Sequence, residues 1–373
     1  MMLFRPKEEL HSAMKDAIQI ISIGQCGCRI GKGFESLGIP VMYINSDEVD
    51  FRNFGVSSDK MLLIEGSGTG GSPTKGAKIF KRYKEQILEF VLTRLDDDKM
   101  VWVIFGGGGG TGNSIGPLLI DYLLSHKYPT GCISTLPSSR YNILAADNAL
   151  KTLRILKDMP LNMFVLADND LLEEKIGLGQ SNWWQKVNQH IILHISSIFD
   201  ILREGKMTQT GLGSVDRGEI MRILQYGNGM ADVRTTYLTL DEFNQDDTTI
   251  TNKLFSPSLI EGYSYKTTKA YLVSVDVPIM GGYTDHAKKI FDLTKEVAGT
   301  AVSRLGMFVD PLLTNSIKVT LINAGLSFPK TIQLRINNLQ RDEGRFIEKK
   351  NRKDSMDFSN IENKFIDDDN FTI

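Results

Sequence analysis

The sequence has few cysteines, no long uninterrupted apolar run and no excess of charge of one sign. Its 373 residues contain only Cys26, Cys28 and Cys132. Three cysteines are too few for a disulfide framework, and a single Cys-x-Cys pair makes a poor zinc site. The 43 Lys and Arg residues balance 45 Asp and Glu residues, which excludes a basic surface for wrapping nucleic acid. We expect a reducing, cytoplasmic setting and no direct binding of nucleic acid.

Targeting and membrane-spanning segments are also missing from the pattern. The charged residues of 5–9 are not followed by the apolar stretch of a secretion signal. The most apolar helix-like segment, Ile191–Leu202, is interrupted by His194 and Asp200. We therefore expect neither secretion nor association with a membrane.

From residue 18 onward, short apolar runs alternate with small-residue loops and helix-like segments, as in parallel strands joined by crossover helices. This predicts an α/β protein with a doubly wound parallel sheet. A long helix is expected from Asn182 to Arg203, because apolar residues recur there at spacings of three and four. The six expected strands are Ile18–Ile23, Val41–Ile44, Met61–Ile64, Val101–Phe105, Gly131–Leu136 and Met163–Ala167.

Beyond Gly205 the composition shifts toward Thr, Asn and Asp, with β-prone runs at Thr235–Leu240, Lys269–Val277 and Ile317–Ile322 and a helix expected over Asp285–Ser303. We interpret this part as a smaller α+β domain. The predicted organisation is an N-terminal extension (1–17), a nucleotide-binding domain (18–180), a central helix (181–205), the α+β domain (206–330), a basic helix (331–353) and a disordered acidic tail (354–373).

The strongest local signal is the run GGGGGTGNS at residues 106–114, which follows an expected strand and opens an apolar helix. Residues without a Cβ expose backbone N–H groups, and the helix dipole adds partial positive charge, so phosphate oxygens are the natural ligand. A flexible glycine linker is the alternative, but linkers do not join a buried strand to a helix start.

Two further glycine loops accompany this run. GQCGCRIG at 24–31 follows the first strand, and GSGTGGSP at 66–73 follows the third. Alone, the first is compatible with a tight turn or a degenerate dinucleotide fingerprint, and its spacing excludes a Walker loop. In the strand order 3-2-1-4-5-6, however, strands one and four are neighbours at the switch point where such sheets bind ligands. Three glycine loops there suit a nucleoside triphosphate.

The three glycine motifs together resemble those of the tubulin/FtsZ superfamily. Segments at 141–142, 167–169 and 213–219 are similar to the ribose-side, guanine-contacting and catalytic loops of that superfamily. The resemblance implies GTP or GDP with Mg2+ as ligands, with Mg2+ held mainly by the phosphates, near Gln25 or Asp47. The residues implied to bind GTP are Gly24, Gln25, Cys26, Gly27, Cys28, Asn45, Asp47, Gly68, Thr69, Gly70, Gly71, Gly107, Gly108, Gly109, Gly110, Thr111, Gly112, Asn113, Pro137, Ser139, Asn142, Asn169, Trp184 and Asn188.

The resemblance also assigns roles at the base and in hydrolysis. Asn169 and Asn188 would hydrogen-bond the guanine edge, and Trp184 would stack on the base. Asp216 and Glu219, three residues apart, would complete hydrolysis on the nucleotide of the next subunit in a head-to-tail protofilament. Without the resemblance, these residues would be interpreted as ordinary helix-face, core and helix-start residues.

Several features point to one branch of the superfamily. The extension before the first strand, the basic C-terminal segment and Ser214 in place of the catalytic-loop asparagine look most like the TubZ-type plasmid and phage partition proteins. Cys28 and Ser139 also depart from the usual residues of the superfamily, at positions that bear on ribose contacts and nucleotide exchange. We expect a GTPase filament for DNA segregation, with a DNA-bound adaptor at the C-terminal region. A division or phage-positioning filament, a nucleotide-regulated adaptor that does not polymerise and a dinucleotide oxidoreductase remain alternatives.

Overall fold

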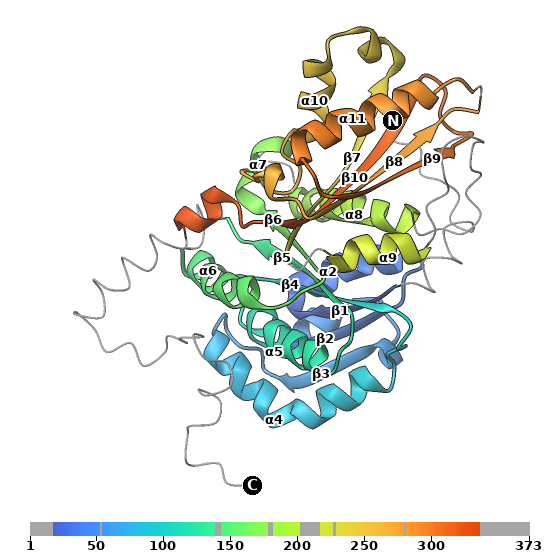
Figure 1. Ribbon diagram of the computed structural model, residues 1–373. Coiled ribbons are helices and arrows are strands. Elements are labelled where there is room, and N and C mark those ends of the chain that lie inside the picture. Colours follow the sequence, from blue (N-terminus) through green and yellow to red (C-terminus); the bar gives the residue numbers. More distant parts are fainter. Residues whose placement is uncertain are drawn as a thin grey trace.

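A computed structural model describes residues 18–52, 54–138, 143–177, 182–201, 217–226, 229–279 and 281–335 (Figure 1). The predicted N-terminal extension, the acidic tail and the basic helix beyond residue 335 lie outside these ranges. The strands of the described residues form one ten-stranded sheet in the order β3-β2-β1-β4-β5-β6-β7-β10-β8-β9. Among the residues in these ranges, no helix combines the length and the apolar character that a membrane span needs.

The first six strands are all parallel, and their order confirms the predicted arrangement around the switch point. β1, β5 and β6 are buried along their whole length, and β4 is buried except at Gly106, which explains their continuous apolar runs. Each observed strand contains or matches the expected one. The six strands are β1 (Ile18–Ile23), β2 (Val41–Asp47), β3 (Met61–Gly66), β4 (Met100–Gly106), β5 (Thr130–Leu136) and β6 (Met163–Asp168).

Helices cover both faces of this parallel part of the sheet (Figure 1). On one face, α2 (Gly24–Glu35) packs on β2, β4 and α8 (Trp183–Ile201). A Cβ at Gly33 of α2 would lie 2.0 Å from Ile192 of α8, so the absent side chain allows the two helices to approach. On the other face, α4 (Pro73–Leu92), α5 (Thr111–Ser125) and α6 (Ile143–Asp158) bury a second apolar cluster.

The second half of the chain continues the same sheet. β7 joins β6 through a single register pair, Phe164 with Met230, and β10 pairs antiparallel with both β7 and β8. A third apolar cluster lies between these strands and their helices. The strands are β7 (Met230–Thr239), β8 (Ala270–Val277), β9 (Val302–Val309) and β10 (Ser316–Leu326), and the helices are α9 (Arg217–Tyr226), α10 (Asp247–Phe255) and α11 (Thr284–Ala298). The described residues also form the short helices α3 (Glu48–Arg52) and α7 (Asn169–Ile176), the 3-10 turns η1 (Ser58–Lys60), η2 (Leu240–Asn244) and η3 (Tyr265–Thr267), and a helical turn at residues 330–335.

One expectation for this half is wrong. The predicted helix Asp285–Ser303 ends earlier, because Gly299 adopts a φ of +72°, which terminates α11 at Ala298. Val302 and Ser303 instead begin β9, an edge strand that the sequence analysis did not predict. Its first residues alternate between exposed and half-buried, so the run lacks the continuous apolar character of the inner strands.

A buried histidine links α8 to β7. The backbone N–H of Thr235 donates to Nδ1 of His194 over 3.2 Å, which leaves the Nε2 proton facing Nε2 of His190, also at 3.2 Å. Burial lowers the pKa of His194 to about 3, and the charges of His190, Arg234 and Lys175 act in the same direction. The ring is therefore neutral in the folded protein at physiological pH.

Candidate functional site

The first and fourth strands end side by side, and a helix begins after each of them. Ile23 at the end of β1 lies opposite Phe105 of β4. α2 begins at Gly24 and α5 at Thr111, and neither helix has a side-chain hydrogen bond at its N-cap. First-turn N–H groups without a side-chain cap can donate to an anion, and the dipoles of both helices favour negative charge there. The structure thus brings together the two loops that the sequence predicts to converge.

The loops after β2 and β3 join the same edge. Ser46 Oγ lies 2.6 Å from Thr111 Oγ1, and Thr69 Oγ1 lies 3.4 Å from the same atom. The backbone N–H of Gly68 donates to the Ser46 carbonyl over 2.7 Å. Three glycine loops and the Asn45–Asp47 turn therefore meet around the start of α5. Ser46 was not among the predicted binding residues, although both of its neighbours were.

Several of the predicted glycines are required by packing. A Cβ at Gly27 would lie 2.3 Å from the carbonyl oxygen of Ile104, and one at Gly112 would lie 3.0 Å from that of Ile23. These glycines let α2 and α5 start close to the strands. Other predicted glycines with a neighbour within 3 Å of the Cβ position are Gly24, Gly68, Gly107, Gly108 and Gly110.

Three other glycines face open space. A Cβ at Gly70, Gly71 or Gly109 would meet no atom within 4 Å. Gly70 and Gly71 have φ values of +60° and +76°, a conformation that side chains disfavour, whereas Gly109 is not in that region. These glycines belong to two different loops that contact each other, since a Cβ at Gly110 would touch Thr69. The arrangement is a cradle that a ligand with several anionic oxygens fits.

Polar side chains from the start of α2, the end of β2 and α3 contact one another beside the cradle. Gln25 Nε2 donates to Asp50 Oδ1 over 2.5 Å, and Asn45 Nδ2 donates to Asp50 Oδ2 over 2.9 Å. Asp47 accepts the backbone N–H of Val49. Oxygen donors of this kind suit Mg2+. No group of three or more His, Cys, Asp or Glu side chains that could hold a metal by itself occurs in the described part of the chain. Asp50 was not predicted.

Cys26 and Cys28 lie near the start of α2. Cys28 is buried in the core, where its thiol donates to the carbonyls of Ser22 and Ile44. Cys26 Sγ lies 3.5 Å from Thr135 Oγ1. Burial raises the pKa of both thiols, so both are protonated at neutral pH. They contribute volume and weak hydrogen bonds to the loop rather than thiolate chemistry.

The residues predicted to contact the base lie on α7 and α8. Asn169 is 4% exposed, and its Oδ1 meets no hydrogen-bond partner among the described residues. Trp184 is 54% exposed and its ring lies edge-on to that of Trp183, with 4.0 Å between centroids. Asn188 is half-buried one helical turn further along α8. One buried amide with an unsatisfied oxygen and one exposed indole face are suited to a heterocyclic base.

Other predicted residues are placed as follows. Asn113 is buried in the first turn of α5, where its Oδ1 accepts the Thr152 hydroxyl, and Pro137 is half-buried after β5. Ser139 and Asn142 lie outside the described residues, as do Ser214 and Asp216. Asn148 of α6 donates to the Gly71 carbonyl over 3.2 Å.

The predicted catalytic acid Glu219 lies in the first turn of α9. Its Oε1 accepts a hydrogen bond from Nε of Arg304, 2.8 Å away on the edge strand β9. The side chains of Arg304 and Glu219 are 43% and 30% exposed, so the pair lies at the surface. Arg304 was not predicted, because 85 positions separate it from Glu219 and nothing in the sequence relates the two.

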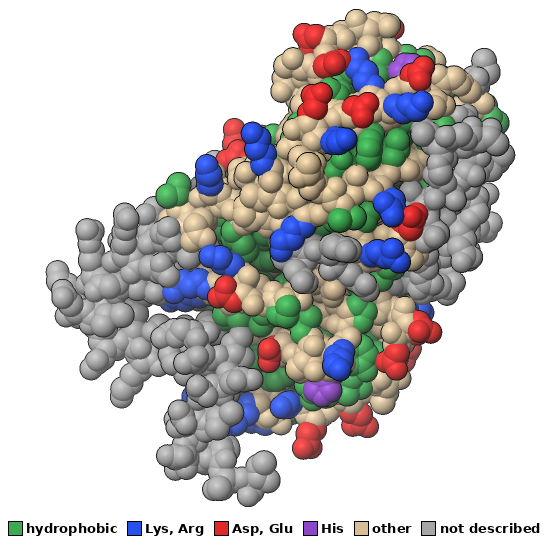
Figure 2. Space-filling view, viewed as in Figure 1, with side chains coloured by type: hydrophobic (Ala, Val, Ile, Leu, Met, Phe, Trp, Pro, Cys, Tyr) green, Lys and Arg blue, Asp and Glu red, His purple; other side chains and the backbone are tan. Residues whose placement is uncertain are grey.

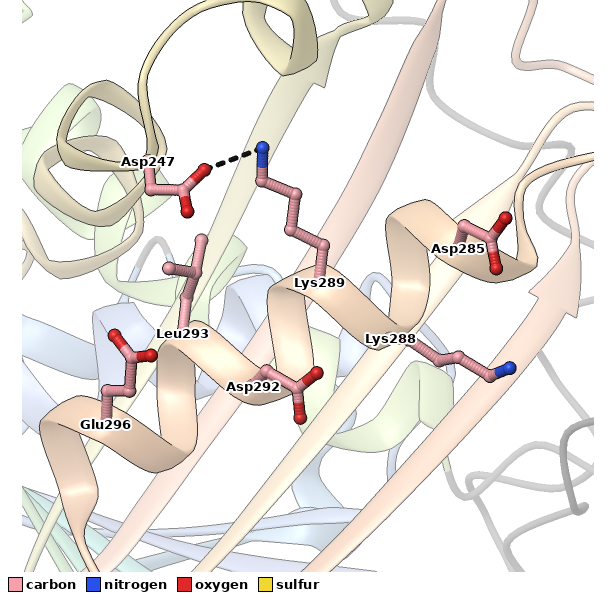
Figure 3. A pocket seen from close by; sticks show the side chains of 7 residues that line it. All are labelled: Asp247, Asp285, Lys288, Lys289, Asp292, Leu293 and Glu296. Carbon is pink, nitrogen blue, oxygen red and sulfur yellow. Dashed lines mark ion pairs between the residues drawn. The ribbon is translucent and has the colours of Figure 1, made fainter.

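A hollow on α10 and α11 lies elsewhere on the second half of the chain (Figure 3). Lys289 points across it toward Asp247, and their charged atoms are 2.7 Å apart. Its lining comprises Asp247, Asp285, Lys288, Lys289, Asp292, Leu293 and Glu296. Acidic and basic side chains are interspersed here and over the rest of the face that Figure 2 shows, so neither sign forms a single patch there. None of the lining residues belongs to the glycine loops.

Comparison with known proteins supports the interpretation of the glycine loops. Residues 17–177 match the family model described as Tubulin/FtsZ family, GTPase domain. The tubulin-like protein CetZ of Pyrococcus abyssi is 25% identical over 337 residues, covering 84% of this chain and 87% of that protein. Cell division protein FtsZ 1 of Pyrococcus horikoshii is 23% identical over 330 residues, covering 84% and 82%. A GTPγS-form protofilament structure of Bacillus thuringiensis serovar israelensis TubZ has a TM-score of 0.76 at 15% identity, covering 91% of this chain and 94% of that chain.

These comparisons confirm the resemblance at the level of the superfamily. They do not single out the TubZ branch, because these two relatives found by sequence are named CetZ and FtsZ, whereas TubZ is found by its structure. The matched segment 17–177 contains all three glycine loops and ends after Asn169.

Proposed function

We propose that this chain, which has the tubulin/FtsZ fold, is a tubulin/FtsZ superfamily GTPase that binds GTP in the glycine cradle, assembles head to tail and hydrolyses GTP where two subunits meet. The observation that carries the proposal is the convergence of three glycine loops beside two helix N-termini without side-chain caps, with glycines of two of these loops facing open space. Many backbone N–H donors around one space suit the charge of a triphosphate.

The base end of the site supports guanine. A buried asparagine with an unsatisfied oxygen can accept from the N–H groups of guanine, which adenine does not offer in the same pattern. Asn169 and Asn188 would contact the guanine edge, and the exposed Trp184 would stack on the ring. Mg2+, held mainly by the phosphates near Gln25 and Asp47, would neutralise negative charge on them.

Hydrolysis would require the next subunit. The side chains that meet at the start of α5 are the hydroxyls of Ser46, Thr69 and Thr111, which are weak bases. Glu219 lies on α9 in the second half of the chain, at the surface. We propose that Glu219, with Asp216, orients the attacking water on the nucleotide of the neighbouring subunit. The TubZ protofilament structure, in which that protein assembles in a GTPγS form, supports head-to-tail assembly.

The test is the variant Glu219→Ala, with Glu296→Ala on the exposed side of α11 as a control for the loss of one negative charge. Glu219→Ala should bind GTP and assemble as the wild type does, since the glycine cradle is intact, but release phosphate at least ~10²-fold more slowly. Glu296→Ala should hydrolyse normally. Light scattering and phosphate release measured on the same sample separate assembly from turnover.

Mixing the two proteins tests action between subunits. Small amounts of Glu219→Ala should make wild-type filaments persist, because each variant subunit leaves its neighbour's GTP intact. If assembled Glu219→Ala hydrolyses GTP at the wild-type rate, Glu219 takes no part in hydrolysis. A wild-type protein that binds ATP and GTP equally, or that does not assemble with GTP, would contradict the proposal as a whole.

We propose DNA segregation as the cellular role, with a DNA-bound adaptor contacting the C-terminal region. The structural similarity to TubZ supports this role, whereas the relatives named CetZ and FtsZ support a division or positioning filament instead. Deleting the gene in its host distinguishes the two roles. Faster plasmid loss with normal division supports segregation, and a change in division or cell shape with normal plasmid retention supports the alternative.

A further inference from the structure

A short helix at residues 330–335, which follows β10, lies against the end of β6 and beside α6 and α7 (Figure 1). Arg335 Nη1 donates to Asp168 Oδ2 over 3.1 Å, and Nη2 lies 3.9 Å from Asp170 Oδ2. On the same helix, Gln333 accepts from Lys157 of α6 over 3.2 Å. The second half of the chain therefore reaches back to the strand end that leads into α7.

Arg335 forms an ion pair with the buried carboxylate of Asp168. Asp168 is 4% exposed, and burial raises its pKa, whereas the neighbouring Arg335 charge acts against this shift. The donors of a guanidinium lie in a rigid plane, and one such group can contact two carboxylates at once. The ammonium group of lysine does not have this planar arrangement of donors. The contact therefore holds two acidic residues in a fixed relation.

Those two acidic residues stand on either side of Asn169. Asp168 caps α7, since its Oδ1 accepts the backbone N–H of Asp170 over 3.1 Å. Ser138, which follows β5, donates to Asp170 Oδ1 over 2.7 Å. The backbone before and after Asn169 is thus fixed through side chains from two other segments. Between them, Asn169 is buried with an amide oxygen that no described residue satisfies.

We propose that Arg335 is a positioning residue for base recognition: by holding Asp168 and Asp170, it sets the direction of the Asn169 amide toward guanine. This inference rests on the proposed function. Arg335 does not touch the nucleotide; it acts through the residues that flank Asn169.

The experiment compares nucleotide preference in the full chain. Arg335→Ala should lower the ratio of GTP to ATP affinity at least tenfold, and affinity for ITP, which lacks the 2-amino group, should change less than that for GTP. Arg335→Lys keeps the charge but not the planar fork and should give an intermediate ratio. Gln333→Ala on the same helix is the control and should keep the wild-type ratio. Binding is measured at concentrations below assembly, by titration with fluorescent nucleotides.

The ratio separates positioning from general structural support. If Arg335→Ala weakens GTP and ATP equally, or leaves the ratio unchanged, the positioning role is wrong. Should Arg335→Ala fail to fold, Arg335→Lys provides the same comparison, and a wild-type ratio in that variant together with a wild-type ratio in Asp170→Asn overturns the inference. If the wild-type protein has no preference for GTP over ATP, the proposed function itself is wrong. If the wild type prefers GTP and the Arg335 variant keeps that preference, only the inference about Arg335 is wrong.

Discussion

Gly109 tests whether phosphates occupy the cradle. Its position has no atom within 4 Å of an added Cβ, and its φ is not in the left-handed region, so Gly109→Ala should fold with a stability change within ~0.5 kcal/mol. A methyl group in the cradle would, however, displace a ligand oxygen. We expect nucleotide affinity to fall at least ~10-fold, which corresponds to ~1.4 kcal/mol.

The assay is thermal unfolding with and without GDP. At a concentration of ~100 times the wild-type Kd, bound nucleotide stabilises the wild type by ~2.7 kcal/mol, and a tenfold weaker site would reduce this to ~1.4 kcal/mol. Gly27→Ala is the contrasting control, because its Cβ would lie 2.3 Å from a backbone carbonyl and overpacking costs ~1–3 kcal/mol without ligand. Equal stabilisation of wild type and Gly109→Ala by GDP would show that phosphates do not lie at Gly109.

Three further predictions address the base, the C-terminal segment and the buried histidine. Trp184→Ala should weaken nucleotide binding by ~1–3 kcal/mol if the exposed indole stacks on the base, and unchanged affinity in a folded variant would place the indole outside the site. Deletion from Arg341 should leave GTP binding intact while altering filament bundling or adaptor recruitment, as sedimentation would report. Burial lowers the pKa of His194 to about 3 in the folded protein, below its ordinary pKa in the unfolded chain. The contribution of the neutral ring to the free energy of unfolding is therefore complete above the unfolded pKa and is lost as the pH falls, by ~2 kcal/mol between about pH 7 and pH 5. Chemical denaturation at a series of pH values should show this decrease in the free energy of unfolding, and His194→Gln should make the decrease smaller.

Much of the first half of the fold could be predicted from its pattern. Parallel strands buried on both faces read as continuous apolar runs, and the glycine loops that follow them mark their carboxyl ends. The convergence of the loops followed from strand order alone. β9 could not be found in the same way, because an exposed edge strand with Arg304 in it has neither the apolar run nor a strict alternation.

The contacts made by the second half of the chain could not be predicted. Arg335 and Asp168 are 167 positions apart, and Arg304 and Glu219 are 85 apart, so no local spacing relates either pair. Each arginine also has the sequence context of an ordinary surface residue. Their partners became visible only when the sheet order placed β9 beside β8 and brought the helix after β10 to the end of β6.

The glycines show why a motif alone does not define a binding site. In one continuous run, Gly107 and Gly108 pack against β5 and α6, Gly112 packs against β1, and Gly109 alone of the four faces open space. All four residues are glycines, and the sequence predicts the same role, GTP binding, for each of them. Packing glycines would resist substitution even in a protein that bound no ligand, since a Cβ there meets backbone or a neighbouring side chain. A substitution at a ligand-facing glycine instead becomes costly only when the ligand is present. Dependence of the substitution's effect on added nucleotide is therefore the property that distinguishes the two kinds of glycine, and it can be measured position by position along the run.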